Sequence, residues 1–392
     1  MKALVLAPQP FFSPRGTPFS VYYRTLVTSE LDVKVDLLTY GEGQDVDLPG
    51  VRIIRIPRIP FLGPIKVGPS YQKLVLDVFM IIWTVALLIR HRYDFVHAHE
   101  ESVFYCLFLK PVFGFKLIYD MHSSLPQQLT NFQFTTLTFF IRLFTVLENA
   151  CLKYADAVIT ICPDLRDHVN GLLGPTRKHF LIENSIFEPV KLKSAAAIPR
   201  DGQNNGSGRL PEDKELIVYA GTLEPYQGID ILLEAFAKAA RQDERAFLVI
   251  AGGNPAQVTH YKAAAEKLGI GPRALFTGRV PQHMAKEYNS RATLLVSPRS
   301  SGTNTPLKIY EQLASGIPLL ATRIHSHTQV LDESVAFLAD PDAEAMAEAM
   351  LAALQSGEQR QRIAANAKRL YNREYSRPVY EKKMKSLLGR IA

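Results

Sequence analysis

The chain has 392 residues, of which 47% are hydrophobic and 21% are charged, with a formal net charge of +7 and a pI near 9.1. Its length exceeds one ordinary hydrophobic core and fits two domains, and its composition excludes a disordered chain. The basic excess indicates anionic partners, which include phosphorylated substrates, an acidic membrane surface and nucleic acid, without choosing among them.

Three features bear on the cellular compartment. Cys106, Cys151 and Cys162 show neither metal-binding spacing nor an even number for a disulfide framework, so we interpret them as buried thiols in a reducing compartment. The N-terminal run MKALVLAPQP predicts a first β-strand rather than a signal peptide, so we expect a cytoplasmic protein. The apolar run 78–89 follows Asp77 and falls short of the ~20 residues of a membrane-spanning helix, so we expect a buried helix.

Short apolar runs alternate with longer segments through the first half of the chain, a pattern typical of repeated βαβ units. The predicted strands are 2–7, 33–40, 95–98, 116–119, 157–161 and 180–183, and the predicted helices are 19–31, 71–91 and 125–154. Basic residues and prolines in 51–69 predict a strand and loop with a solvated basic edge, with a membrane or acceptor docking surface as the alternative. Core or interdomain packing explains the aromatic side chains of 125–154, with a lipid acceptor or a bilayer surface as the alternative.

The composition changes at 189–214, which is rich in Ala, Pro, Gly, Asn and Lys and predicts a flexible linker. The linker separates a first domain, 1–188, from a second domain, 215–372, in which the βαβ pattern returns. There the predicted strands are 216–220, 246–251, 274–277 and 293–296, and the predicted helices are 229–240, 259–268 and 283–291. The rest, 344–392, is mostly helical and becomes basic toward its end.

The segment 293–322, TLLVSPRSSGTNTPLKIYEQLASGIPLLAT, predicts a strand, a helix and a second strand. We predict Thr305 as the N-cap of this helix and Pro306 as its first residue. The free N–H groups and the dipole of such a helix favour a phosphate, to which Lys308 adds a positive charge. Glu311, about one turn later, can accept hydrogen bonds from sugar hydroxyls. The alternative is a plain βαβ unit with a solvated lysine and glutamate.

The first half contains two further candidate features. Thr17-Pro18 repeats the threonine–proline pair of the second half, and Gly16 permits close backbone approach. Arg15 adds charge there, although a proline-stiffened turn with Arg15 in solvent is the alternative. Polar side chains also gather at the ends of two neighbouring predicted strands, namely His97, His99, Glu100, Asp120 and His122. They include metal-ligand types but no HExxH or comparable spacing, so we expect hydrogen bonding to a substrate.

The order of these motifs resembles a family 4 glycosyltransferase of the GT-B fold, almost from end to end. The matching motifs are Arg15-Gly16-Thr17, His122, Asn184, Ala220-Gly221, Gly252-Gly253, Gly278-Arg279-Val280 and the helix 306–318. The resemblance implies an α/β protein with two Rossmann-like domains facing a central cleft, and a C-terminal helix, 373–392, that returns to the first domain. It also implies sugar transfer from a nucleotide diphosphate sugar with retention at the anomeric carbon. Nothing in the motifs asks for a metal, and we expect no cofactor.

The resemblance assigns roles by motif. The catalytic candidates are His122, which contacts the donor sugar, Lys308, and Glu311, which holds the ribose hydroxyls. The donor-binding candidates are Gly16, Thr222, Arg279, Val280, Thr303, Asn304, Thr305, Leu307, Lys308 and Glu311. The acceptor-side candidates are Arg15, Thr17, His99, Glu100 and Asp120.

The chain departs from the family pattern at three positions. Thr303 stands where the first of two glutamates is usual, and Thr222 and Gln227 stand where an arginine and a lysine are usual. Such changes accompany an altered donor, a weak or inactive relative, or replacement of the missing charge. We favour replacement, because a diphosphate leaving group needs cationic partners, and the candidate replacements are Lys308, Arg279, Arg299 and Arg15.

We therefore expect a retaining glycosyltransferase with a sugar or lipid-linked acceptor, such as a cell-surface glycan precursor. Its basic charge also agrees with peripheral contact with an acidic membrane surface on the cytoplasmic side. Two other interpretations stay open. One is a sugar-nucleotide epimerase that uses Glu100, Glu101 or Asp120 as acid and base, and the other is a non-catalytic protein that binds nucleotide sugars. Nucleic-acid binding ranks last, because no helix-turn-helix or aromatic-basic platform is apparent.

Overall fold

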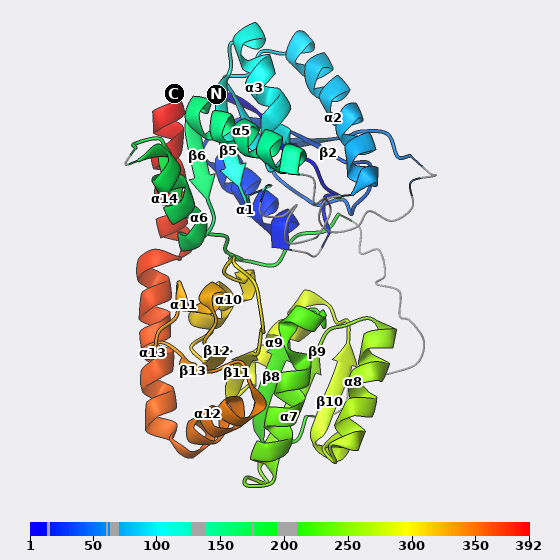
Figure 1. Ribbon diagram of the computed structural model, residues 1–392, viewed down its shortest axis with the longest axis vertical. Helices are drawn as coiled ribbons and strands as arrows, with labels where there is room; N and C mark the ends of the chain where they lie inside the picture. Colours follow the sequence, from blue (N-terminus) through cyan, green and yellow to red (C-terminus); the bar gives the residue numbers. More distant parts are fainter. Residues whose placement is uncertain are drawn as a thin grey trace. The chain divides into compact units, whose positions relative to one another are not determined.

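A computed structural model describes residues 1–13, 16–59, 62, 70–124, 126, 138–174, 176–193 and 210–392. The chain forms two compact units, of which unit 1 contains Met1–Ser194 with Arg377–Ala392 and unit 2 contains Ala195–Ser376 (Figure 1). The expectations for Arg15, for 125–137 except Pro126, for most of the basic loop at 60–69 and for the middle of the linker lie outside the described residues.

Unit 1 is built on a sheet whose described strands all pair in parallel, in the order β3-β2-β1-β4-β5-β6-β7. The strands are β1 (Lys2–Ala7), β2 (Lys34–Thr39), β3 (Val51–Arg55), β4 (Phe95–His99), β5 (Lys116–Met121), β6 (Ala157–Thr160) and β7 (His179–Leu181). The helices are α1 (Gly16–Glu30), α2 (Tyr71–Arg90), α3 (Ser102–Phe113), α5 (Thr138–Tyr154), α6 (Pro163–Leu173) and α14 (Arg377–Ile391).

Both faces of this sheet are covered, and β1 shows why. Successive side chains of a strand point to opposite faces, and both sets in β1 are apolar. Leu4 and Leu6 pack in a core with side chains of α2, α3, α5 and α6. Ala3 and Val5 pack in a second core with side chains of α1 and α14. The C-terminal helix α14 therefore belongs to unit 1, as the resemblance implies, and it begins at Arg377.

Unit 2 repeats the design with a parallel sheet of order β10-β9-β8-β11-β12-β13. Its strands are β8 (Glu215–Ala220), β9 (Ala246–Ala251), β10 (Ala274–Gly278), β11 (Leu294–Ser297), β12 (Leu319–Thr322) and β13 (Phe337–Ala339). Its helices are α7 (Ile229–Ala240), α8 (Pro255–Lys267), α9 (Gln282–Ser290), α10 (Leu307–Ser315), α11 (His325–Thr328), α12 (Ala343–Gln355) and α13 (Gly357–Glu374), with short 3-10 turns η2 (Pro225–Gln227) and η3 (Gly271–Arg273). Helices α7 and α12 share one core, and α10 and α13 share the core on the opposite face.

Two predicted helix starts are wrong. Helix α1 begins at Gly16, so Thr17 and Pro18 lie in its first turn and do not cap it. Helix α10 begins at Leu307, and Pro306 is its N-cap with an extended ψ of 133° and no side-chain cap hydrogen bond. A proline fixes only φ, so the same residue fits the cap as well as the first turn.

The expectation of a buried helix at 78–89 is also wrong. Helix α2 buries only one side of its surface, including Met80 and Leu87, and it exposes Val78 and Ile82. Among the helices within the described ranges, α2 is the one that is long and apolar enough to cross a membrane, with 28% of that apolar window buried. A run that is apolar on all sides carries no periodic signal for the side that packs on the protein.

Candidate active site

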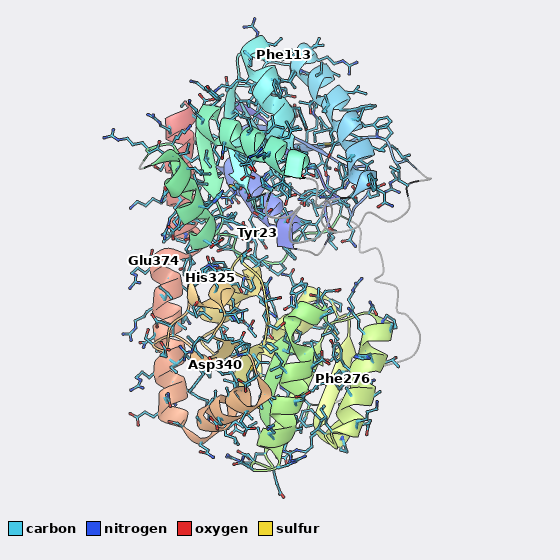
Figure 2. The ribbon with its side chains drawn as sticks, viewed as in Figure 1. Tyr23, Phe113, Phe276, His325, Asp340 and Glu374 are labelled. Atoms are coloured by element: carbon cyan, nitrogen blue, oxygen red, sulfur yellow. The ribbon has the colours of Figure 1, made fainter. Side chains whose placement is uncertain are left out.

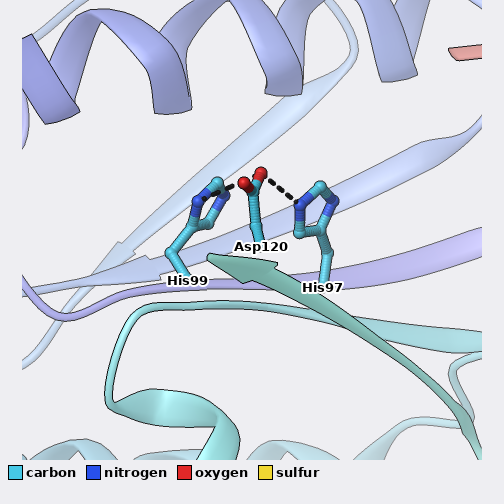
Figure 3. Close-up of side chains that lie close together, drawn as sticks. All are labelled: His97, His99 and Asp120. Atoms are coloured by element: carbon cyan, nitrogen blue, oxygen red, sulfur yellow. Dashed lines mark hydrogen bonds and ion pairs between the residues drawn. The ribbon is translucent and has the colours of Figure 1, made fainter. Parts of the chain in front are cut away.

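The candidate site of unit 1 lies at the carboxyl ends of β4 and β5. His97 and His99 alternate with Ala98 and therefore share one face of the sheet, on the side of the α1 and α14 core. His99 pairs in register with Asp120, which places the carboxylate on the same face as the two imidazoles. Figure 3 shows the three side chains together, with Asp120 between the two histidines.

A buried arginine completes this group, and it was not predicted from the sequence. Arg24 of α1 is fully buried, and its Nε lies 3.0 Å from Oδ2 of Asp120. Although burial raises the pKa of Asp120, the Arg24 guanidinium and the imidazoles hold that pKa well below its usual range. An ionised carboxylate only accepts hydrogen bonds, so His97 donates from Nε2 to Asp120 Oδ2 at 2.9 Å. The signal for Arg24 was its position inside the apolar run SVYYRTLV.

His122 joins the group through His99. Nδ1 of His99 lies 3.0 Å from Nε2 of His122 and 3.4 Å from Oδ2 of Asp120. Burial lowers the pKa of His99 well below its usual range and that of His122 to about 4, so both imidazoles are neutral at pH 7. A proton on His99 Nδ1 satisfies both contacts, and it leaves His122 with its own proton on Nδ1.

The same residue types are metal ligands, and His97, His99 and Asp120 offer ligand atoms that all lie within 4.8 Å of one another. The Asp120 carboxylate is already shared by the Arg24 guanidinium and His97. A metal ion there would add positive charge beside a buried guanidinium, which is unfavourable. The donor set therefore fits a hydrogen-bonded network better than a metal centre.

A second cluster of titratable side chains lies beside the end of β4. Burial and the neighbouring Glu101 raise the pKa of Glu100 to about 7 and that of Asp77 to about 7. Asp77 accepts a hydrogen bond from the hydroxyl of Tyr40 at 2.7 Å, and Lys73 pairs with Glu101 at 3.5 Å. Glu100 adopts a positive φ of 50°, which is uncommon for a residue with a side chain. The backbone N–H of Glu100 donates to the carbonyl oxygen of Asp120 at 3.2 Å, so Glu100 adjoins the Asp120 group, while Glu101 has the larger influence on its carboxyl group.

The remaining unit 1 candidates lie in the first turn of α1. Thr17 is half-buried. A Cβ at Gly16 would meet no atom within 4 Å among the described residues. No contact of the protein in the described ranges therefore requires a glycine there. Arg15 lies outside the described residues.

The candidate site of unit 2 lies at the carboxyl ends of β8, β9, β10 and β11, where two glycines let the loops approach. A Cβ at Gly252, whose φ is +135°, would lie 1.8 Å from the carbonyl oxygen of Gly221. A Cβ at Gly228, whose φ is +69°, would lie 2.0 Å from the carbonyl oxygen of Pro298. Glycine is therefore required where the β8 loop packs on the loops that follow β9 and β11.

Lys308 connects α10 with the loop after β8. Its Nζ donates to Oε1 of Gln227 at 3.3 Å and lies 4.2 Å from the ring centroid of Tyr219. Burial and the nearby Arg299 guanidinium lower the pKa of Lys308 to about 7. Arg299 itself stacks over the Tyr226 ring at 5.2 Å. Two cations thus lie close together near the N-terminus of α10, with aromatic rings and an amide rather than carboxylates as their partners.

The loop before α10 is held by Arg299, which donates to the carbonyl oxygen of Ser301 at 2.6 Å and to that of Asn304 at 3.3 Å. Thr303 is exposed, whereas Thr305 is buried and its Oγ1 has no hydrogen-bond partner among the described residues. Leu307 is the first residue of α10, so its backbone N–H lies among those that a helix leaves unpaired.

Glu311 lies about one turn after Lys308 on α10. Burial raises its pKa to about 6, while Lys286 acts in the opposite direction. Thr222 is exposed, and its carbonyl oxygen accepts a hydrogen bond from the Tyr219 hydroxyl at 2.5 Å. Arg279 is exposed and Val280 is half-buried after β10. Lys308, Gln227 and Thr222 are therefore joined through Tyr219.

A buried histidine supports this loop region and was not singled out from the sequence. The His327 ring contacts Ser297 Oγ at 3.1 Å and the carbonyl oxygen of Thr322 at 2.9 Å. Burial lowers its pKa to about 4, and Lys308 and Arg299 act in the same direction. A neutral His327 thus links the ends of β11 and β12 beneath the two cations. The dispersed positions of these residues in the sequence gave no local signal.

Two family patterns match the chain, one in each half. Residues 22–185 match the family described as "Glycosyl transferase 4-like domain", and residues 202–370 match the family described as "Glycosyl transferases group 1". The chain therefore belongs to the group 1 glycosyltransferases and has the GT-B fold. It is a transferase.

Relatives and a solved structure agree with this family. The chain is 25% identical to alpha-D-kanosaminyltransferase of Streptomyces kanamyceticus, over 72% of this chain and 73% of that protein. It is 23% identical to D-inositol 3-phosphate glycosyltransferase of Streptosporangium roseum, over 76% of this chain and 70% of that protein. It is similar to the structure of Anabaena Alr3699/HepE in complex with UDP-glucose, with a TM-score of 0.69, 15% identity and 99% of each chain covered.

Proposed function

We propose that this protein transfers a sugar from a nucleotide diphosphate sugar to a lipid-linked or other glycan-precursor acceptor, with retention at the anomeric carbon. The donor occupies unit 2, and the acceptor occupies unit 1. The reaction takes place in the cytoplasm, at the inner face of the membrane. The observation that carries the proposal is the pair of neighbouring cations, Lys308 and Arg299, near the N-terminus of α10.

The chemistry of the leaving group explains why this arrangement suits a transferase. When the bond between the anomeric carbon and the phosphate oxygen breaks, negative charge develops on the nucleoside diphosphate. Unpaired N–H groups of α10 and the positive charge of Lys308 and Arg299 stabilise that charge. These cations replace the arginine and lysine that the family pattern places at Thr222 and Gln227.

The other candidates take roles that follow from their chemistry. Glu311 accepts hydrogen bonds from the ribose hydroxyls, and Arg279 with Val280 borders the base. His122, with its proton on Nδ1, donates a hydrogen bond to the donor sugar, and His99 and Asp120 hold it in that tautomer. UDP-glucose is the first donor to test, because the structure of the similar Anabaena protein contains it.

Purified protein is incubated with radiolabelled UDP-, GDP- and ADP-sugars and a membrane extract, and product formation is measured. We expect transfer from one donor class and a loss of about 10²-fold or more in Lys308→Ala, with the variant still folded by circular dichroism. The matched control is Lys262→Ala on the exposed side of α8, which we expect to retain wild-type transfer. Absence of transfer from every donor, together with unchanged donor binding in Lys308→Ala, rejects the proposal. Conversion of the donor to an epimer without transfer also rejects it and favours the epimerase.

A further inference from the structure

Helices α2, α3 and α5 of unit 1 all carry large apolar side chains that are exposed. On α2 the exposed side chains recur at helical spacing and form one stripe, which consists of Tyr71, Leu74, Val75, Val78, Ile81, Ile82 and Ile89. On α3 the exposed side chains are Phe108 and Val112, and on α5 they are Leu143, Val146 and Tyr154. We call this surface the apolar face. Scattered single apolar residues are normal, but stripes on three adjacent helices are not.

The three helices form one layer. All three contribute buried side chains to the same core over the sheet, and α3 packs against both α2 and α5. Phe104 of α3 meets Phe144 of α5 with ring centroids 6.0 Å apart, and Lys110 donates to the carbonyl oxygen of Tyr154 at 2.9 Å. Figure 1 shows α2, α3 and α5 next to one another in unit 1, and Figure 2 labels Phe113 at the end of α3. The exposed stripes therefore belong to a single continuous surface.

Polar contacts fix α2 to the unit, so its apolar stripe stays outside. Asp77 accepts a hydrogen bond at 2.7 Å from Tyr40, the residue after β2, and Lys73 pairs with Glu101 at 3.5 Å. Met80 on the same side is fully buried. A helix held by buried polar pairs cannot leave the domain to cross a bilayer, whereas its free side can enter the interface of one.

The charges on the apolar face favour an anionic partner. Its exposed charged side chains within the described residues of the three helices are all cations, namely Arg90, Arg142 and Lys153. The carboxylates of these helices turn inward, where Asp77 meets Tyr40 and Glu148 accepts from Ser124 at 2.8 Å. Apolar side chains bordered by arginine and lysine are the pattern of a surface that binds acidic lipids.

A groove lies along one edge of the apolar face, between β3 and α2. It has a volume of about 440 Å³, and its lining combines apolar side chains with cations, including Ile54, Ile82, Trp83, Leu87, Arg90 and His91. The single tryptophan of the chain is thus placed where an apolar surface meets charge, which is the usual position of tryptophan at a membrane interface.

We propose that the apolar face docks on a bilayer that contains anionic phospholipids. Val78, Ile82, Phe108 and Val146 enter the boundary between headgroups and acyl chains, and Arg90, Arg142 and Lys153 contact the phosphates. The inference deepens the proposed function and rests on it only for the lipid-linked acceptor, because docking itself needs neither donor nor acceptor.

The test is co-sedimentation of the full-length protein with vesicles of phosphatidylcholine alone, or with one third phosphatidylglycerol. We expect binding to the anionic vesicles to be about tenfold tighter, and the difference to shrink at high salt. The variant Val78→Glu/Ile82→Glu should lose about tenfold or more, because two inserted side chains become charged. The second variant, Phe108→Ser/Val112→Ser, should lose binding as well without adding charge. The matched control is Leu172→Glu on α6, outside the apolar face. Leu172 is 47% exposed, close to the 53% of Ile82, and this variant should bind as wild type.

Circular dichroism and thermal unfolding confirm that each variant is folded. Equal binding to both vesicle types, or wild-type binding by both folded double variants, overturns the proposal. A wild-type dimer that binds no vesicle and that Val78→Glu/Ile82→Glu converts to a monomer also overturns it, since the face is then a self-association interface. Donor binding measured without vesicles separates failure of docking from failure of the transferase assignment.

Discussion

Lys308 and Gln227 meet at 3.3 Å, with the ammonium group of the lysine donating to the amide oxygen of the glutamine. The family pattern places a basic residue where this chain has Gln227. An amide partner leaves the charge of Lys308 uncompensated, and a carboxylate would neutralise it. We therefore expect the attraction of this site for a diphosphate to depend on a neutral side chain at residue 227.

Gln227→Glu tests this dependence. We expect nucleoside diphosphate affinity to fall by about tenfold, because a carboxylate near 3 Å from Lys308 offsets the attraction to phosphate. Gln227→Leu removes the hydrogen bond without adding charge and should cost less. Isothermal titration with UDP, GDP and ADP measures both variants. Equal loss in the two variants would mean that the hydrogen bond, not the charge, is what matters.

The affinity for the sugar donor should fall on both sides of a pH optimum, once toward basic pH and once toward acidic pH. The pKa of Lys308 is lowered to about 7 by burial and Arg299, so binding should weaken as the pH rises above about 7. The pKa of Glu311 is raised to about 6 by burial, so binding should also weaken as the pH falls below about 6. Lys308→Arg should remove the basic limb, and Glu311→Gln should remove the acidic limb.

Proton uptake provides an independent measurement of Lys308. A bound diphosphate raises the pKa of a neighbouring ammonium, so binding above pH 7 should take up a proton, which titration in buffers of different ionisation enthalpy detects. In the absence of ligand, the lowered pKa of Lys308 also determines how the stability of the fold changes with pH. The unfolded chain holds this proton up to the ordinary lysine pKa of 10.5, so stability should rise between about pH 7 and pH 10.5.

Removal of the Asp120 charge should destabilise unit 1 strongly. Asp120→Asn leaves Arg24 buried without its counter-charge, and we expect a loss of about 3–5 kcal/mol in urea unfolding. The depressed pKa of Asp120 contributes stability above the unfolded pKa near 3.8, and that stability is lost as the pH falls below this value. Asp120→Asn should therefore lack this acid-dependent loss.

A partly exposed pair provides the control for Asp120. Glu30→Gln breaks the contact of Glu30 with Arg377, which lies 2.6 Å away on α14. We expect a change within about 1 kcal/mol, because water screens this pair. Similar losses in Asp120→Asn and Glu30→Gln would contradict the special cost of burial at Arg24.

Helices and strands could be predicted where the local pattern of apolar and polar residues matches the faces that the fold buries. Strand β1 and helix α7 were predicted at their observed bounds, since one is a short apolar run and the other an apolar-periodic helix after a glycine. Helix α3 was missed, because its run SVFYCLFLKPVF is apolar on every side and carries a proline. Pattern reasoning needs a contrast between two faces, and α3 lacks it.

The candidate site was predictable only in part, for a related reason. Lys308 and Glu311 were proposed from the sequence because they follow a strand and a loop within one short segment. Arg24 and His327 were not proposed, because each has a partner on a strand that is distant from it in the sequence. Arg24 contacts Asp120 of β5, and His327 contacts Ser297 of β11. Gln227 was visible only as a departure from a family pattern, and its partner became clear once the loop after β8 met α10.

Thr303 should matter little to turnover despite its place in the family pattern. It is exposed, and its carbonyl oxygen rather than its side chain accepts a hydrogen bond from Gln329. We expect Thr303→Ala to change turnover by less than about threefold and Glu311→Ala to lower it by about tenfold or more. Steady-state kinetics with the active donor compares the two. A larger effect at Thr303 would show that its hydroxyl replaces the missing carboxylate directly.

His99 should act on the reaction through His122. The 3.0 Å contact between their rings fixes the His122 tautomer, so His99→Ala should lower turnover by about tenfold while leaving donor affinity nearly unchanged. His122→Ala should lower turnover by about 10²-fold, since it removes the imidazole that donates the hydrogen bond to the sugar. If His99 is a positioning residue, the double variant should be no slower than His122→Ala, because the second change has nothing left to position. Additive losses would instead assign His99 a contact of its own with the substrate, and unchanged unfolding in both single variants shows that the effect is not structural.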